Sequence, residues 1–420
     1  MRLTFLENLN FFKRPAYCIC FSLFDAFSII FLGNEPLNVT KVGTQNTCKL
    51  SELSASTTVA DGTIYISTAK SDPGLFKIDT EKQDIEINGT LSLAVITDNK
   101  HLPKVYNTSQ PNKLCPTCPV QVSFGNLTEV EVNWEAYKKR PIDFILEDQY
   151  NIGSFFINSG YFLVKLNSDG SVEHVLGDTS QKDTDYAPGN SRSAKFSYIS
   201  AVIQHNETVL LLADYLNNCV REYNSEVDWV RQLVGKCNGT PSTSHALEPG
   251  QVLSSDANFM SGLLDMVHLQ KQNVLVLIDY GYRQFSKYNF ATDTVELLHP
   301  TLKRDIPQPS NMVKSQDEKF LYVVHRFALS KVNLHTYEVT KLIGEVTADE
   351  TNRDTLFVGG PFSKAAIGYL HNINWLVQDQ LLVSTGTYSN EMLMFFDLKG
   401  EQAYSACRGK FTHSDLLTPS

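Results

Sequence analysis

The sequence predicts an all-β protein, a β-propeller built from four-stranded antiparallel blades. Phe and Tyr, which favour strands, number 24 and 18 in the 420 residues. Short apolar runs end in one polar residue and a turn, as LLLAD does at residues 210–214. This pattern recurs along the chain at a regular spacing, which is typical of repeat architectures.

The clearest copies of the repeat are LLLADYLNNCVREYN (residues 210–224) and VLVLIDYGYRQFSKYN (residues 274–289). In both, an Asp ends the apolar run and an Asn closes the unit ten residues later. Four further copies have His325, Gly386 or Ala69 in place of the Asp, or follow the pattern more loosely at residues 154–167. Six copies can therefore be counted.

A small polar residue also precedes the end of the run by fourteen positions in four copies. These residues are Ser200, Asp265, Asn311 and Asn372. An apolar strand follows each of them, so one unit comprises four strands in about 45–65 residues, which matches a propeller blade.

The two kinds of strand in the unit are explained by their surroundings in a blade. Inner strands lie between neighbouring blades with both faces buried, which predicts unbroken runs such as VLLLA and VLVLI. Outer strands such as CVREYN alternate, which predicts one face in water.

The Asp that ends each run is expected to accept backbone N–H groups of the following turn. In the same turn, Asn217 and Asn218 suit a hairpin with positive φ. A catalytic or metal-binding Asp is the alternative, although His, Gly and Ala occupy this position in other copies.

Residues 174–237 resemble the NHL-repeat family of β-propellers. The features that carry the resemblance are Gly177-Asp178, Ala194-Lys195-Phe196, the segment 210–224 and Gly235. They are similar to the family's opening glycine, its Ala-x-Phe, and its apolar strand that ends in Asp before an Asn-rich turn. The resemblance continues from 250 to 410, although a Pro-x-Gly before the first strand is absent. The six copies of the unit predict six blades, with seven as the alternative if residues 89–139 form a degraded blade rather than an irregular insertion.

The N-terminal residues 1–33 predict a secretory signal peptide. Arg2, Lys13 and Arg14 precede an apolar segment at 16–32, which Asp25 interrupts. Seventeen residues form a helix of about 26 Å, which barely spans a bilayer, so a cleaved leader is favoured. An uncleaved type II signal anchor and a buried helix are the alternatives. The propeller then occupies 34–410, followed by a tail at 411–420.

The charge of the chain bears on its partners. A net charge of −10 argues against nucleic acid, which requires a concentrated basic surface. A membrane partner is expected only if residues 16–32 are an anchor. We expect a monomer that binds a protein or a glycan.

The cysteines fit an oxidising, extracellular or lumenal location. Removal of the leader leaves six, which allows three disulfides. The expected pairs are Cys219 with Cys237 on adjacent strands, Cys48 with Cys407 at the two ends of the propeller, and Cys115 with Cys118 within CPTCP. Zinc is the alternative for the last pair, but there is no second CxxC. Sequons for N-glycosylation occur at Asn38, Asn88, Asn107, Asn126, Asn206 and Asn238.

The first strands of the blades suggest one candidate site. First strands line the central channel of a propeller, so their polar residues converge there. The candidate ligands of a hard cation such as Ca²⁺ are Asp143, Ser200, Asp265, Asn311 and Asn372. Related six-bladed lactonases and peptide-amidating lyases use channel metals. The alternative is that each residue only begins its strand after a turn. His268 and His371 lie near this ring, and a lone His beside a strand is usually structural.

The predicted function is that of a secreted or lumenal binding glycoprotein, with loops on one propeller face presented to a protein or glycan. No HExxH, GxSxG or Gly-rich phosphate loop occurs. A metal-dependent hydrolase or lyase with its site in the channel is the alternative, because propellers support both roles.

Overall fold

The structure is a computed structural model of the chain. It describes residues 19–21, 27–29, 53–60, 63–68, 75–84, 120–129, 144–151, 153–158, 160–181, 185–238, 245–325, 327–344, 360–365, 367, 370–377, 381–386 and 392–408. The predicted tail at 411–420 and most of the predicted leader lie outside these residues. Two short strands, β1 (Ile19–Phe21) and β2 (Phe27–Ile29), lie within the leader.

Six antiparallel sheets contain the strands of these residues. The first sheet runs in the order β1, β2, β6 (Val120–Glu129), β5 (Leu75–Asp84), β4 (Thr63–Thr68) and β3 (Leu53–Ala60). The second runs β10 (Val172–Leu176), β9 (Leu163–Leu166), β8 (Phe155–Asn158) and β7 (Phe144–Glu147). The third runs β11 (Ile199–Gln204), β12 (Val209–Asp214), β13 (Cys219–Asn224) and β14 (Trp229–Val234).

The remaining three sheets follow in chain order. The fourth runs β15 (Val252–Ser254), β19 (Thr294–Leu297), β18 (Gln284–Asn289), β17 (Val274–Asp279) and β16 (Leu263–Leu269). The fifth runs β20 (Pro309–Lys314), β21 (Phe320–His325), β22 (Ala328–Asn333) and β23 (Val339–Gly344). The sixth runs β24 (Gly360–Pro361), β28 (Gln402–Arg408), β27 (Met392–Asp397), β26 (Leu381–Gly386) and β25 (Leu370–Val377). One short helix, α1 (Leu302–Asp305), precedes β20.

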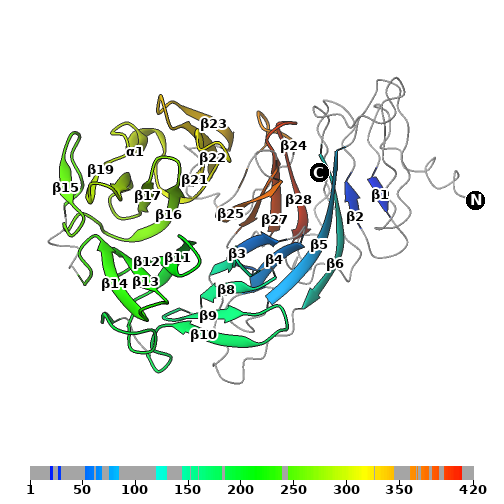
Figure 1. Ribbon diagram of the computed structural model, residues 1–420. Helices are drawn as coiled ribbons and strands as arrows, with labels where there is room; N and C mark the ends of the chain where they lie inside the picture. Colours follow the sequence, from blue (N-terminus) through cyan, green and yellow to red (C-terminus); the bar gives the residue numbers. More distant parts are fainter. Residues whose placement is uncertain are drawn as a thin grey trace, which may run out of the picture.

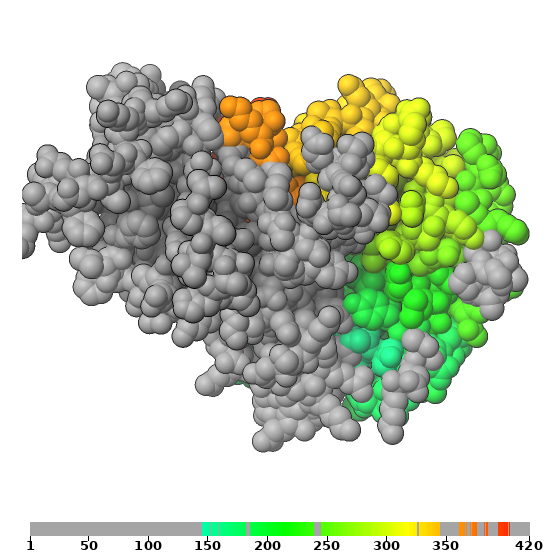
Figure 2. Space-filling model, turned by 180° about the vertical axis from the view of Figure 1, so that it is seen from behind, coloured from blue at the N-terminus to red at the C-terminus, as the bar shows by residue number. Residues whose placement is uncertain are grey.

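The sheets are arranged side by side around a centre (Figure 1). Their first strands contact one another in the order β3, β7, β11, β16, β20, β25 and β3 again. Seen from behind, the third to fifth sheets, coloured green to yellow, form one continuous surface (Figure 2). The all-β class and a propeller of four-stranded antiparallel blades are confirmed.

The second strands are buried on both faces, as the unbroken apolar runs predicted. In β12, Leu210 and Leu212 pack towards the second sheet, whereas Leu211 and Ala213 pack towards the fourth. Every residue of β17 is buried. From the second sheet to the sixth, the core is therefore a series of apolar layers, one between each pair of neighbouring sheets.

The polar residues that end the second strands occupy equivalent positions. Asp214 pairs with Cys219, Asp279 with Gln284, and His325 with Ala328. In each case the last residue of the second strand pairs with the first residue of the third. The turn after Asp214 contains Asn218 at φ +59°, in agreement with the expected hairpin. The repeat deduced from the sequence is therefore a structural repeat.

On β13, Glu222 and Asn224 are half-buried on one face, as the alternation predicts, but the opposite face contains a buried charged residue. Arg221 is fully buried. Its guanidinium lies between the rings of Phe196 and Tyr186, 4.4 and 4.9 Å from their centroids. The loop before β11 covers the strand, so the alternating polar residue is satisfied inside the protein.

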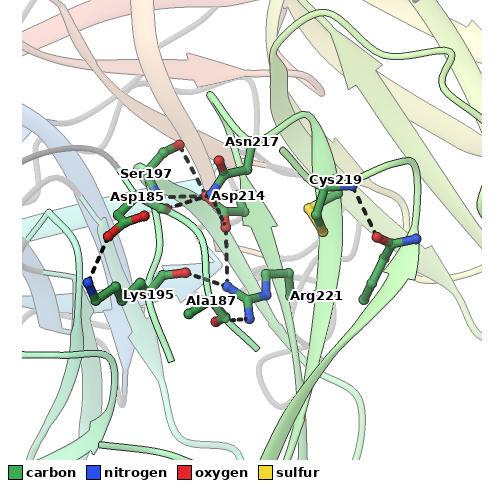
Figure 3. Close-up of a disulfide and its surroundings, with 10 residues drawn as sticks. Asp185, Ala187, Lys195, Ser197, Asp214, Asn217, Cys219 and Arg221 are labelled. Carbon is green, nitrogen blue, oxygen red and sulfur yellow. Dashed lines mark hydrogen bonds and ion pairs between the residues drawn. A yellow bond between two sulfur atoms is a disulfide. The ribbon is translucent and has the colours of Figure 1, made fainter. Parts of the chain in front are cut away.

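Asp214 and Arg221 form a buried pair at the centre of this cluster (Figure 3). Asp214 accepts hydrogen bonds from the Ser197 backbone N–H at 2.9 Å and from Asn217 Nδ2 at 2.9 Å. Arg221 lies 3.5 Å from the Asp214 carboxylate and donates to the carbonyls of Lys195 and Ala187 at 2.5 and 2.8 Å. The carboxylate thus holds the preceding loop as well as its own turn, a larger role than the turn bond predicted from the sequence.

The glycines of the NHL-like motif lie where the chain leaves the outermost strand. Gly177 follows β10 at φ +99° and Gly235 follows β14 at φ +80°. A Cβ at either position would lie 2.6 Å from a backbone carbonyl oxygen, of Tyr161 and Asn218 respectively. Both positions therefore require glycine.

Cys219 and Cys237 form a disulfide with a Cα–Cα distance of 5.1 Å, the pair expected from the strand order. Cys237 lies beyond the end of β14, however, and not at the end of the strand as predicted. Cys48, Cys115 and Cys118 lie outside the described residues, and only the backbone of Cys407 is described.

Part of the predicted insertion at 89–139 is regular. Residues 120–129 form β6 and pair with β5, so this segment supplies the fourth strand of the first sheet. In the described part of the chain, no helix is long and apolar enough to span a membrane.

We predict that Arg221→Met lowers the free energy of unfolding by roughly 3–5 kcal/mol, because it leaves the Asp214 carboxylate buried without its cation. Urea unfolding measures the effect. Arg231→Met is the matched control, since Arg231 is 59% exposed and pairs with Glu222 at the surface; its loss should cost less than about 1 kcal/mol. Equal losses in the two variants would contradict the assignment.

The Cys219–Cys237 disulfide closes a loop with a sequence separation of 18. We predict that the double variant Cys219→Ser, Cys237→Ser loses about 3 kcal/mol of unfolding free energy, because the unfolded chain regains the conformations that the crosslink removed. Denaturant titration without reductant gives the value. An unchanged midpoint would show that the crosslink does not contribute to stability.

Candidate functional site

Three of the predicted ring residues occupy equivalent positions on the first strands. Asp265 pairs with Ile278, Asn311 with Val324 and Asn372 with Thr385, each one step before the end of the second strand. A register shift, with one extra residue on the first strand, precedes each of them.

Ser200 does not belong to this set. It is the extra residue of its own register shift, between Ile199 and Ala201, and Ala201 holds the position equivalent to Asp265. The count of fourteen residues placed Ser200 one step too early, because the hairpin from the first to the second strand is one residue shorter in this sheet. Gln204 pairs with Leu210, whereas the equivalent His268 pairs with Leu275. Asp143 lies outside the described residues.

The ring residues tie each first strand to the next sheet. Asp265 Oδ2 accepts a hydrogen bond from the Met312 N–H at 2.8 Å, and Asn311 Oδ1 accepts one from the Ile373 N–H at 2.9 Å. Ser200 Oγ donates to the Leu263 carbonyl at 2.9 Å. These bonds join β11 to β16, β16 to β20, and β20 to β25, so the same side chains that were candidate ligands connect neighbouring sheets.

Asp265 is the most perturbed carboxyl of the ring. Burial raises its pKa to about 7, although the N–H groups of Met312 and Met266 act in the opposite direction. Within the ranges that the structure describes, no cluster of three or more His, Cys, Asp and Glu side chains is arranged to hold a metal ion.

A cavity of about 520 Å³ opens beside the ring, where the first strands reach the hairpins to the second strands. Five first strands contribute to its wall, namely β7, β11, β16, β20 and β25. The apolar part of the wall consists of Leu146, Val202, Ile203, Met266, Val267, Met312, Val313 and Trp375. This volume lies within the range of about 300–1,000 Å³ that is usual for ligand pockets.

The polar rim of the cavity is held by bonds between neighbouring hairpins. Glu318 accepts the N–H groups of Gln270 and Lys271 at 3.0 and 2.9 Å. Lys314 Nζ donates to Glu318 at 2.5 Å and to the His268 carbonyl at 2.7 Å. Trp375 Nε1 donates to the Lys314 carbonyl at 2.8 Å. The rim residues of β16, β20 and β25 are therefore fixed relative to one another.

The second and third sheets are joined in the same way. Gln204 accepts the Gln149 N–H at 2.8 Å and donates to Asp148 at 3.0 Å. Asp148 also pairs with Lys165 at 2.7 Å. These hydrogen bonds lower the pKa of Asp148 to about 2, in spite of the burial that would raise it.

Two histidines, His205 and His268, form part of this region, and only His268 is among the residues singled out from the sequence. The rings of His268 and His205 lie 4.8 Å apart, and Phe290 contacts both at about 5 Å. His268 lines the cavity, is 8% exposed, and has no hydrogen-bond partner at either ring nitrogen. Burial lowers its pKa to about 4, with further lowering from His205 and Lys314 and an opposing effect of Glu318. His268 is thus not a lone structural histidine, and the pairing joins residues 63 positions apart in two sheets, which no local motif indicates.

A second cavity, of about 380 Å³, lies between the fifth and sixth sheets. Lys331 lies over the ring of Phe320 at 3.8 Å and is part of its wall. Of the sequons, Asn206 and Asn238 lie at exposed turns, Asn206 in the hairpin between β11 and β12. Asn126 lies on β6, and the other three lie outside the described residues.

Comparison with known proteins finds distant similarity to solved structures alone. No family model and no curated protein matches the chain. A Bacteroides thetaiotaomicron protein of unknown function is similar over 88% of this chain and 71% of its own, with a TM-score of 0.49 and 11% identity. A chain of a nidogen/laminin complex is similar over 68% of this chain and 88% of its own, with a TM-score of 0.44 and 9% identity.

A virginiamycin B lyase from Staphylococcus aureus is similar over 88% of this chain and 87% of its own, with a TM-score of 0.42 and 11% identity. The sheet topology of this chain defines it as a β-propeller protein. The NHL-repeat family stays a prediction from the sequence motifs.

We predict that Asp265→Asn flattens the pH dependence of stability. The folded-state pKa of about 7 lies above the ordinary 3.8, so the folded protein holds the extra proton between about pH 4 and 7. Unfolding free energy therefore falls as pH rises through that interval. Between pH 5 and pH 8 the parent should therefore lose roughly 1–3 kcal/mol more unfolding free energy than the variant.

Urea unfolding at pH 5, 6, 7 and 8 measures this effect. The exposed Asp256→Asn is the control and should leave the profile unchanged. A parallel profile for Asp265→Asn would show that the carboxyl titrates alike in the folded and unfolded states.

Proposed function

We propose that the chain is a secreted or lumenal propeller glycoprotein that binds a protein or glycan partner at the cavity beside the first-strand hairpins. The observation that carries the proposal is the wall of this cavity. Five sheets supply apolar side chains, and hydrogen bonds between hairpins fix the polar rim before any partner arrives. A rigid rim favours binding, because little side-chain freedom remains to be lost.

Export of the chain is supported by the disulfide and by the sequons. Cys219 and Cys237 are joined as in proteins of oxidising compartments. Asn206 and Asn238 lie at exposed turns, where an attached glycan has room. A leader at 1–33, cleaved or retained as an anchor, completes this proposal, and the binding unit is a monomer.

We infer six blades rather than seven. Support comes from the six sheets and from the contact of β25 with β3, which brings the last first strand back to the first. A disulfide between Cys48 and Cys407 would join the two ends of such a ring.

The rival function is a metal-dependent hydrolase or lyase with Ca²⁺ or Zn²⁺ held by Asp143, Asp265, Asn311 and Asn372. Two oxygens that this site would use, on Asp265 and Asn311, already accept backbone N–H groups. A raised pKa also keeps much of Asp265 neutral near pH 7, and a neutral carboxyl is a poor ligand for a hard cation. Both observations favour the binder over the enzyme.

The test of the proposal uses the purified full chain on an array of defined extracellular proteins and glycans. We predict at least one ligand whose affinity falls tenfold or more in Lys271→Glu, because Lys271 lies on the cavity rim. Lys287→Glu, which changes a lysine of the outer strands that pairs with Glu296, should bind as the parent does.

Metal analysis of the same protein, before and after chelation, separates the rival. A stoichiometric ion whose removal abolishes a hydrolytic or lyase activity, and which Asp265→Ala also removes, would establish the enzyme instead.

A further inference from the structure

The imidazole of His268 is a buried polar group without a partner in a cavity wall. Its side chain is more than nine-tenths buried, it lines the 520 Å³ cavity, and neither ring nitrogen makes a hydrogen bond. Buried polar groups in folded proteins are nearly always paired, so each exception requires an explanation. A ligand that reaches the cavity would supply the missing partner.

Around His268, the lysine side chains have N–H donors that make no hydrogen bond, whereas the oxygens of the nearby carboxylate all accept one. Lys314 has three N–H donors, of which two are bonded, to the His268 carbonyl and to Glu318. Lys271 Nζ donates to the Gln316 carbonyl, which leaves two further donors. Both carboxylate oxygens of Glu318 are taken, by the Gln270 and Lys271 N–H groups and by Lys314. The rim therefore offers hydrogen-bond donors and positive charge, although the chain as a whole carries −10.

The apolar walls next to the rim disfavour a strongly hydroxylated ligand. Met266, Met312, Val202 and Trp375 form apolar surfaces next to the rim, and the indole N–H of Trp375 is already bonded to a carbonyl. Sugar hydroxyls placed against these walls would lose their hydrogen bonds to water without replacement. Apolar side chains next to one carboxylate would instead fit both parts of the site.

We infer that the cavity binds an acidic peptide segment of a partner protein, with a Glu or Asp carboxylate between His268, Lys271 and Lys314 and its apolar neighbours against the methionine and tryptophan wall. This inference rests on the proposed binding function and names the class of partner. The carboxylate accepts hydrogen bonds from the two ammonium groups and from an imidazole N–H, and all three bonds are charge-assisted because the acceptor is ionised.

Binding of this kind is coupled to a proton. The groups that face His268 are His205 and Lys314, which lower its pKa, and Glu318, which opposes them. A bound carboxylate would raise the pKa of His268 from about 4. The complex therefore takes up a proton that the free protein lacks, and affinity rises as the pH falls.

The experiment titrates the full chain with acetyl-Leu-Glu-Leu-amide and with acetyl-Leu-Gln-Leu-amide by calorimetry at pH 7.5 and 5.5, at low and high salt. We expect the Glu peptide to bind at least tenfold more tightly than the Gln peptide. The preference should be larger at pH 5.5, smaller at high salt, and largely lost in Lys271→Met. In His268→Gln the preference should remain while its change with pH disappears.

The controls change the same residue types away from the cavity. Lys287→Met and His299→Gln should behave as the parent, since Lys287 pairs with Glu296 and His299 stacks on Tyr337. Three outcomes would overturn the inference. They are equal affinity for the two peptides, no binding of either peptide by the folded chain, and cavity-dependent binding of a sulfated tetrasaccharide in their place. If an array ligand still bound the parent more tightly than Lys271→Glu, the proposed binding function would survive the failure of the peptide inference. If no array ligand depended on Lys271, both the inference and the proposed function would be wrong.

Discussion

Burial of the second strands on both faces is the constraint on which the rest of the structure depends. β12 and β17 have no face in water, so a polar residue at the end of such a strand can be satisfied only inside the protein. Asp214 is satisfied by Ser197, Asn217 and Arg221, and Asp279 by the N–H groups of Ser261 and Tyr282 at 2.6 and 2.7 Å. The last position of the second strand is thus satisfied by different partners in different sheets, because the position requires only that its side chain is paired by its own surroundings.

The same constraint governs the centre of the molecule. First strands from neighbouring sheets meet there, and Asp265 and Asn311 use their side-chain oxygens to bind the backbone of the next sheet. At the level of Asp265 and Asn311, the polar side chains that converge on the channel are therefore already used in hydrogen bonds between the sheets. Chemistry that remains available to a ligand lies further along the strands, at the cavity where the hairpins begin. The position of the candidate site follows from which polar groups the assembly of sheets has already used.

Sequence alone predicts the repeat and the burial of its strands, because both depend on residues that are close together in the chain. The run at 210–214 and its copy before Asp279 are such cases. The register of the first strands was harder to predict, since the hairpin between β11 and β12 is one residue shorter than its equivalents, which moves Ser200 out of the ring. The burial of Arg221 was not predicted, because the rings that cover it, of Tyr186 and Phe196, are distant in sequence. The pairing of His205 with His268 joins two sheets, so no spacing within one repeat contains it.

The unpartnered imidazole of His268 is the observation that structural needs explain least. An apolar side chain of similar size at this position would remove two unpaired nitrogens and pack equally well against Phe290, so the fold gains nothing from a histidine. The neighbouring Lys314 makes the position worse for a protonated ring, and burial does the same. The fold therefore accepts a group that is destabilising in both protonation states while the cavity is empty. An anion in the cavity reverses both effects, because it pairs the ring and offsets the charge of the lysine.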